Sequence, residues 1–230
     1  MVDIDFYCRV YDGVLEDDVC QEYINMFEET QQIDGDKRRK LSVCYDNSGK
    51  KLCGNCDCER TNPFEYERFA QLNQHTMKKM QEVISQYRDD CQITNIQWPK
   101  KYGFEEPNIK KFKVDSTIGH GMEMHSDIWS FAHSKRILGI LVYLNGGFSE
   151  GETYFPLFDV KVQPSAGRAL VFPSSWDYIH CGLPPRHPAT TEAKYFIMFH
   201  TVFLDEGVQY PTGINRTDRK SLGNYEYLRT

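Results

Sequence analysis

The sequence predicts a mainly β protein, a sandwich or barrel, with supporting helices near its N-terminus. Two observations predict this class. From about residue 93 onward, short apolar runs alternate with glycine, proline and asparagine, which is the pattern of many short strands. Before that point, two stretches repeat their apolar residues at steps of three and four, the spacing of amphipathic helices.

Composition is that of a globular protein. The chain has 230 residues, of which 40% are hydrophobic, enough to bury a sizeable core. We expect a single domain over residues 1–230: a strand and support helices in 1–92, a β core in 93–204 and a tail in 205–230. The net charge is -6 and the basic residues are dispersed, so nucleic acid is a disfavoured partner.

The N-terminus shows no sign of a targeting segment. Residues 1–5 have neither a basic region nor an apolar region, so we predict no signal peptide. No apolar run approaches the roughly 20 residues that a membrane-spanning helix needs. We therefore expect a cytoplasmic protein without a membrane partner.

The N-terminal part begins with a strand and an amphipathic helix. Residues 5–11 predict the strand. Residues 16–29 predict the helix, because Val19, Tyr23 and Phe27 recur at helical spacing and three acidic residues occupy its first turn.

The longest predicted helix opens at Asn62-Pro63, with asparagine as N-cap and proline at the first helical position. An apolar stripe follows at steps of three and four: Phe69, Leu72, Thr76, Met80, Val83 and Tyr87. Such a stripe indicates a face packed on a sheet rather than a cofactor site.

Residues 33–60 between the two helices have no clear period and predict a loop, with a short strand near 41–45. Four of the chain's eight cysteines lie here: Cys44, Cys53, Cys56 and Cys58. Four thiolates from one loop could hold a structural zinc ion. Only one Cys-x-x-Cys pair is present, however, so free thiols are the favoured alternative.

The rest of the chain reads as strands. We expect them at 109–114, 122–125, 137–144, 151–156, 160–162, 169–173 and 193–204. Residues 205–230 turn polar and contain Asp-Glu-Gly and Pro-Thr-Gly breaks, so we expect a tail on the surface.

A candidate metal site lies within the β region. His125 and Asp127 are two residues apart, so on an extended segment both side chains leave the same face. A lone His-x-Asp is more often a surface pair or a core histidine. Here His180 follows the apolar strand 169–173, and Lys194 lies fourteen residues further on. Two imidazoles and one carboxylate suit non-haem Fe(II).

The other histidines have simpler interpretations. His75 falls on the long helix, and three others lie in loops where a solvated role is expected: His120, His133 and His187. His200 shares strand parity with Lys194 and so could face the same interior. We interpret it as a core histidine with satisfied hydrogen bonds.

Six motifs occur in an order that resembles the prolyl 4-hydroxylase-like branch of the Fe(II)/2-oxoglutarate dioxygenases, in its stand-alone form. They are His125-Ser126-Asp127, the run from Arg136 to Asn145, residues 151–156, residues 164–172, His180-Cys181-Gly182 and Lys194-Tyr195. The resemblance covers about residues 109 to 204. It implies a double-stranded β-helix, a jelly-roll barrel, with a metal at one open end.

The resemblance also implies roles for single residues. The iron ligands would be His125, Asp127 and His180. Lys194 would pair with the distal carboxylate of 2-oxoglutarate, Tyr143 would donate a hydrogen bond to it, and Thr153 would line the cosubstrate pocket. An interior lysine beside apolar side chains agrees with this, because it is costly without a bound anion.

The chain departs from the family pattern at the other end of the cosubstrate. Phe112 and Met122 stand where the family often has tyrosines, and neither can supply a hydroxyl group. The contacts to the keto-acid end of 2-oxoglutarate are therefore open. The interval from His180 to Lys194 is also longer than the family's usual one.

The implied activity is hydroxylation of an aliphatic C–H bond, with peptidyl proline as the favoured substrate, O2 as oxidant and decarboxylation of 2-oxoglutarate to succinate and CO2. Ascorbate would serve as reductant. The alternatives are hydroxylation of another residue or a small metabolite, and a non-catalytic jelly-roll that binds a metal or carboxylate. Three residues near the presumed mouth could touch substrate, although a structural role is favoured for each: Trp129, Arg136 and Trp176.

Overall fold

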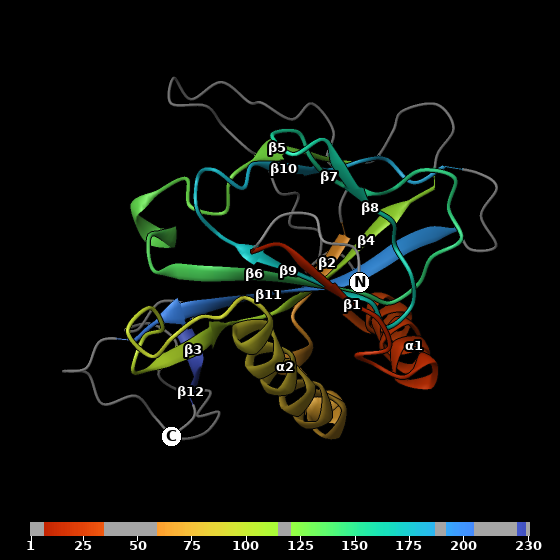
Figure 1. The fold of residues 1–230 in the computed structure, drawn as a ribbon. Helices are drawn as coiled ribbons and strands as arrows, with labels where there is room; N and C mark the ends of the chain where they lie inside the picture. The colour runs from red at the N-terminus through yellow and green to blue at the C-terminus, as the bar shows by residue number, and fades with distance from the viewer. Residues whose placement is uncertain (1–6, 35–58, 115–120, 187–191, 205–224, 229–230) are drawn as a thin grey trace.

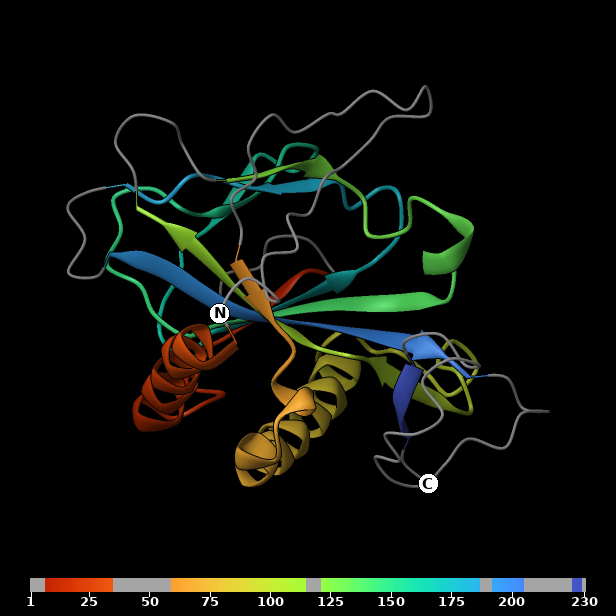
Figure 2. The same ribbon diagram turned by 180° about the vertical axis from the view of Figure 1, so that it is seen from behind.

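The computed structural model describes residues 7–34, 59–114, 121–186, 192–204 and 225–228. They form three layers (Figures 1 and 2): a small sheet, a large sheet, and two helices on the far face of the large sheet. The predicted mainly β class with N-terminal support helices is confirmed.

The large sheet has eight strands in the order β1-β9-β6-β11-β3-β12, with β4 paired to β11 and β2 paired to β4. Their bounds are β1 Arg9–Tyr11, β2 Glu59–Thr61, β3 Tyr102–Glu105, β4 Asn108–Lys113, β6 Arg136–Tyr143, β9 Ala169–Pro173, β11 Ala193–Phe203 and β12 Tyr225–Leu228. The small sheet has the order β5-β10-β7-β8. Its strands are β5 Met122–His125, β7 Thr153–Phe155, β8 Val160–Val162 and β10 His180–Gly182.

The helical layer consists of α1 (Asp17–Asp34) and α2 (Ala70–Asp90). Both lie on the same face of the large sheet in the two opposite views. Phe27 of α1 meets Tyr195 of β11 edge to face, with ring centroids 5.8 Å apart. The Tyr23 hydroxyl joins the two helices, since it donates to the Asn73 Oδ1 and lies 2.9 Å from the Thr76 hydroxyl, which can donate to it. All six members of the apolar stripe on α2 and the turn before it are buried, as predicted.

The start of the second helix differs from the prediction. Asn62 does cap a helix, because its side chain accepts a hydrogen bond from the Phe64 amide, but the capped element is a short 3-10 helix, η2 (Pro63–Glu65). Tyr66 is extended, and a second 3-10 turn, η3 (Glu67–Phe69), precedes α2. The interruption lets both Phe64 and Phe69 reach the core.

Strand β11 separates the two cores through its alternating side chains. Odd-numbered residues such as Tyr195 and Ile197 pack in the cluster under the helices. Even-numbered residues face the other way and line a cavity between the sheets: Lys194, Phe196, Met198 and His200. The predicted parity of His200 with Lys194 is confirmed.

Several expectations need correction or lie outside the described residues. The strands β2, β3, β10 and β12 are additional to those predicted, and β12 replaces part of the expected polar tail by pairing with β3. The predicted strand at 41–45 and the four cysteines of the zinc hypothesis lie outside the described residues. Four described cysteines are buried thiols: Cys8, Cys20, Cys91 and Cys181.

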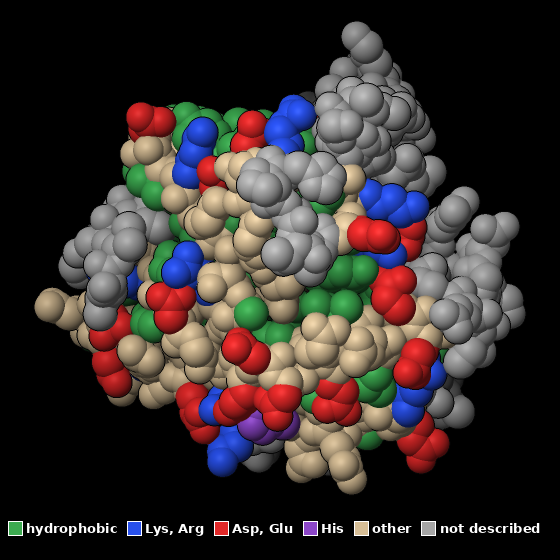
Figure 3. All heavy atoms as spheres, turned by 90° about the vertical axis from the view of Figure 1, so that its right-hand side faces the viewer, with side chains coloured by type: hydrophobic (Ala, Val, Ile, Leu, Met, Phe, Trp, Pro, Cys, Tyr) green, Lys and Arg blue, Asp and Glu red, His purple; other side chains and the backbone are tan. Residues whose placement is uncertain are grey.

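The outer surface of the helical layer is polar. Figure 3 shows acidic side chains concentrated along the lower edge of one face, where the helices lie. Among the described residues, no helix is long and apolar enough to cross a membrane.

Candidate metal centre

The structure brings together the three side chains that the sequence singled out. His125 ends β5, Asp127 follows in the next loop, and His180 begins β10. The two histidines are direct partners in the antiparallel pairing of β5 with β10, with ring centroids 4.4 Å apart. One ligand atom from each of the three residues lies within 4.8 Å of the others. This arrangement can enclose a metal ion from one side.

Backbone contacts orient both imidazole rings. The His125 Nδ1 lies 2.7 Å from the Glu123 carbonyl oxygen, and the His180 Nδ1 lies 3.0 Å from the Tyr178 carbonyl oxygen. A carbonyl oxygen only accepts, so each Nδ1 carries the proton and each Nε2 is left with a lone pair. Fixing the tautomer in this way is typical of metal-binding histidines.

Burial keeps the two histidines neutral. It lowers the pKa of His125 to about 4, and the proximity of His180 adds to the effect. The pKa of His180 is likewise lowered by burial. Neutral imidazole is the form that binds metals, so both rings are ready to bind at neutral pH.

Asp127 is buried and ionised. Burial alone would raise its pKa, but the neighbouring His200 and then His180 hold the pKa well below its usual range. The Asp127 Oδ2 lies 3.3 Å from the His200 Nε2, yet neither atom has a well-aligned hydrogen bond. A buried carboxylate oxygen without such a bond is costly unless a cation completes its surroundings.

A network from the large sheet supports the Asp127 loop. Arg136 on β6 donates through Nη1 to the Asp127 carbonyl oxygen at 3.0 Å and through Nη2 to Glu105 at 2.6 Å. The Glu105 carboxylate also lies 3.5 Å from the His200 Nδ1. Sequence reasoning did not identify His200 or Glu105 as neighbours of the metal site, because β3 and β11 meet only in the folded sheet.

Gly139 of β6 makes room for the same carboxylate. A Cβ atom there would lie 2.7 Å from the Asp127 Oδ2 and 2.8 Å from the Phe172 ring. Any larger residue would therefore push the carboxylate or the ring aside.

Lys194 lies in the same cavity, whose volume is about 700 Å³. Its Nζ donates to the Gly151 carbonyl oxygen at 2.5 Å and stands 5.4 Å from the centres of the Tyr143 and Phe196 rings. Burial lowers its pKa to about 7, although the charge of Glu152 opposes this. In the described part of the chain, no carboxylate forms an ion pair with Lys194.

Tyr143 and Thr153 are joined beside this lysine. Their hydroxyl groups lie 2.7 Å apart. Thr153 lines the cavity, whereas Tyr143 is fully buried behind it and presents its ring face to Lys194. Thr153 thus stands at the cavity wall, whereas Tyr143, which the sequence predicted to donate to the carboxylate, lies behind it and bonds to Thr153.

The three mouth residues have different surroundings. Arg136 lines the cavity but is engaged with Glu105 and Asp127, so it has a structural role. Trp129 lines the cavity and is 67% exposed, whereas Trp176 is exposed away from the cavity lining.

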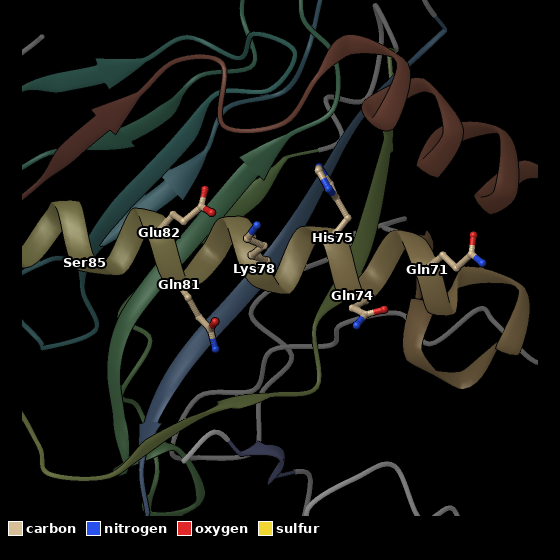
Figure 4. A pocket seen from close by; sticks show the side chains of 7 residues that line it. All are labelled: Gln71, Gln74, His75, Lys78, Gln81, Glu82 and Ser85. Carbon is tan, nitrogen blue, oxygen red and sulfur yellow. The ribbon is translucent and has the colours of Figure 1, made fainter.

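A second hollow lies on the exposed face of α2. Figure 4 shows that its polar side chains point away from the helix in different directions and do not converge on one point. His75 instead bonds to Glu16 at 3.0 Å, which ties α2 to the residue before α1. This hollow does not form a binding site.

Three comparisons relate the chain to known proteins. The comparison with protein-family models found no match. A stretch of 38 residues, 16% of each chain, is 55% identical to a mimivirus protein (Acanthamoeba polyphaga mimivirus) named "Putative prolyl 4-hydroxylase".

Solved structures are similar over most of the chain. A viral collagen prolyl hydroxylase from Paramecium bursaria Chlorella virus-1, in complex with 2-oxoglutarate, gives a TM-score of 0.60 at 20% identity and covers 86% of this chain and 97% of that chain. A Trichoplax adhaerens prolyl hydroxylase, in complex with a peptide fragment of the hypoxia inducible factor, gives 0.59 at 14% identity, with 87% and 85% covered. A Pseudomonas putida prolyl-4-hydroxylase gives 0.53 at 14% identity, with 86% and 94% covered. The chain therefore has the double-stranded β-helix fold of these enzymes, and the predicted likeness to prolyl hydroxylases is confirmed at the level of the fold.

Proposed function

We propose that this protein is an Fe(II)- and 2-oxoglutarate-dependent oxygenase that hydroxylates an aliphatic C–H bond, with peptidyl proline as the favoured substrate. One observation carries the proposal. Two neutral imidazoles and a carboxylate converge at one place in a cavity, and a buried lysine lies within the same cavity.

The donor set fits Fe(II). His125 and His180 would bind through Nε2, and Asp127 would bind through its carboxylate, which is the ligand set of non-haem Fe(II) oxygenases. The poorly bonded Asp127 oxygen supports a cation at this place. When bound, Fe(II) together with 2-oxoglutarate and O2 would supply the oxidising power for hydroxylation, with succinate and CO2 as coproducts.

Lys194 would hold the distal carboxylate of 2-oxoglutarate. Its ammonium group has three donors, and the Gly151 carbonyl accepts one of them. The Thr153 hydroxyl lies on the same part of the cavity wall, fixed by Tyr143. A carboxylate at this position would offset the cost of burying the lysine.

The cavity walls would exclude water around the cosubstrate. Four apolar side chains line it between the lysine and the histidines: Phe112, Leu141, Phe196 and Met198. Phe112 stacks on Phe196, with their planes 5° apart and centroids 5.8 Å apart. Such walls strengthen the electrostatic contacts of a bound anion and limit side reactions.

A peptide is the favoured substrate class because of the cavity's rim. Trp129 and Met124 line the cavity and are both substantially exposed, an unusual placement for large apolar side chains. An exposed tryptophan at a cavity rim suits contact with an apolar ring such as that of proline. The similar enzymes are named prolyl hydroxylases, and one was solved with a peptide fragment.

The test is succinate formation by purified protein supplied with Fe(II), ascorbate and 2-oxoglutarate, compared with His125→Ala and His180→Ala. We expect both substitutions to abolish turnover while the far-UV circular dichroism stays unchanged. Equal succinate formation by the variants would contradict the proposed site. Metal binding without succinate formation, under any peptide tested, would support the non-catalytic binding module instead.

Substrate class is tested separately by mass spectrometry. A library of proline-containing peptides should show a gain of one oxygen atom on proline, dependent on 2-oxoglutarate. The matched control is the same library with each proline replaced by alanine. If both libraries gain oxygen equally, or if only free amino acids or small metabolites gain it, peptidyl proline is not the substrate.

A further inference from the structure

A second lysine faces the cavity in addition to Lys194. Lys110 lies on β4, directly opposite Phe196 of β11, and Phe112 lies directly opposite Lys194. Opposite residues of an antiparallel pair point to the same face. All four side chains line the cavity, so lysine and phenylalanine alternate on this face.

The two lysines stand at opposite corners of this group of four. Diagonal positions of this kind have Cα atoms about 7–8 Å apart. Lys194 is the buried member, and Lys110 is half-buried. Both ammonium groups therefore reach one cavity from neighbouring strands.

Lys110 also reaches toward the metal centre. Its Nζ lies 3.7 Å from the Met122 sulfur on β5 of the small sheet, and 5.8 Å from the centre of the Phe196 ring. Met122 begins the strand that ends at His125, so the Lys110 ammonium group contacts the strand that carries a proposed metal ligand.

A cation beside a metal site favours the binding of an anion between them. A bound divalent metal and the Lys110 ammonium repel each other across a cavity with apolar walls, where screening is weak. Met122 and Phe112, which stand where related enzymes have tyrosines, offer no hydroxyl to a carboxylate at this end. The Lys110 ammonium group can supply the hydrogen-bond donor that those two side chains lack.

We propose that Lys110 binds the C1 carboxylate of 2-oxoglutarate, so that Lys194 and Lys110 hold the two ends of the cosubstrate. This proposal rests on the proposed function, since it names the residue that completes its cosubstrate site. Lys110 thus replaces a neutral hydrogen bond from tyrosine with a charge-assisted one.

The test is binding, measured by calorimetry without O2 on Mn(II)-loaded protein. Two probes are used: 2-oxoglutarate and 2-oxobutanoate, which keeps the keto-acid end but has no distal carboxylate. We expect Lys110→Met to weaken both probes about tenfold, or about 1.4 kcal/mol. Lys194→Met should weaken 2-oxoglutarate alone. Lys110→Arg should restore part of the affinity for both probes.

Metal affinity provides a readout that misfolding would not reproduce. In the absence of either probe, Lys110→Met should bind Mn(II) as tightly as the unaltered protein or more tightly, because a repelling charge is gone. The matched control is Lys113→Met on the same strand, where the lysine faces away from the cavity and pairs with Glu59 at 3.6 Å. It should change neither metal nor probe binding.

The outcomes separate the two proposals. Unchanged 2-oxoglutarate affinity in Lys110→Met, or weakened 2-oxoglutarate with unchanged 2-oxobutanoate, would overturn the role of Lys110 and leave the proposed function standing. Weakened Mn(II) binding in Lys110→Met would show a structural role instead. If the unaltered, metal-loaded protein binds no 2-oxoglutarate, both the proposed function and this role are overturned.

Discussion

Gly139 shows how a single residue controls the proposed metal site. Its missing side chain leaves the space that the Asp127 carboxylate and the Phe172 ring occupy. We predict that Gly139→Ala weakens Mn(II) binding roughly 10–100-fold, the usual effect of disturbing the support of a metal ligand. Isothermal titration calorimetry would measure it.

A double variant separates the two contacts of that new methyl group. Gly139→Ala with Phe172→Leu relieves the clash with the ring but keeps the clash with the carboxylate. Metal affinity should stay low in the double variant. Recovery of affinity would mean that Phe172, rather than Asp127, transmits the effect.

Lys194 predicts a pH dependence of cosubstrate binding. Burial lowers its pKa to about 7, so in the free protein it loses its proton as the pH rises through 7. An anion binds the ammonium form, so 2-oxoglutarate affinity should fall about tenfold per pH unit above 7, with one proton taken up on binding.

Calorimetry in buffers of different ionisation enthalpy would measure that proton uptake. Lys194→Arg is the control, because arginine keeps its charge throughout this range and should remove the dependence. A pH-independent affinity in the unaltered protein between pH 7 and 9 would contradict the expected role of Lys194.

At the scale of single residues, the sequence predicted the members of the site better than their neighbours. The His-x-Asp pair and His180 can be recognised because their spacing is local or follows a clear apolar strand. The contacts of Asp127 with His200 and of Arg136 with Glu105 join residues far apart in the chain. The spacing of residues along the sequence does not predict such long-range pairs.

At the scale of elements, β6 and β3 hold the Asp127 loop in place through one part-buried ion pair. Arg136 and Glu105 are 13% and 12% exposed, and Arg136 also bonds to the Asp127 backbone. We predict that Arg136→Met lowers the free energy of unfolding by roughly 3–5 kcal/mol, because it leaves a largely buried carboxylate without its guanidinium partner. It should also weaken Mn(II) binding, since the loop loses its anchor.

An exposed pair in the same protein offers the comparison. Arg186 and Glu150 are 42% and 49% exposed at a similar distance of 2.8 Å. Arg186→Met should cost about 0–1 kcal/mol, as is usual for surface pairs. Urea denaturation of both variants would measure the difference, and equal losses would show that burial does not set the strength of the Arg136 pair.

The errors in predicting elements have physical causes. The sequence signals of a helix start at Asn62-Pro63 are real, but they cap a 3-10 turn, because packing of Phe64 and Phe69 favours an extended Tyr66 between them. Strand β12 was missed because it has only four residues and follows a long polar stretch, so its short alternation gives a weak signal.

At the scale of the whole molecule, the fold class could be predicted from the sequence, but the packing of its layers against one another could not. The short apolar runs and the helical apolar stripes indicate a β core with support helices. The cavity, however, depends on β11, whose odd-numbered residues pack on the helices while its even-numbered residues face the small sheet. Lys194 and His200 mark one face of this strand in the sequence, but a nearly continuous apolar run gives no sign of what that face packs against.

The zinc hypothesis for the Cys44 to Cys58 segment stays a prediction for the whole protein. Plasma mass spectrometry of the purified chain should find zinc in proportion to protein if these cysteines hold it, and none if they are free thiols. His125→Ala with His180→Ala serves as the control, because zinc that remains in this variant cannot come from the proposed iron site.

The proposed metal site joins the ends of two small-sheet strands to a loop anchored on the large sheet, so metal binding should stabilise the whole fold. A ligand at 100 times its Kd stabilises the native state by about 2.7 kcal/mol. For a chain of this size, each kcal/mol raises Tm by about 2–4 °C. Mn(II) at that excess should therefore raise Tm by roughly 5–10 °C, as measured by scanning calorimetry. His180→Ala should lose the shift, whereas Arg186→Met should keep it. An equal rise in His180→Ala would show that the stabilising metal binds elsewhere, and the Cys44 to Cys58 segment would then be the first place to look.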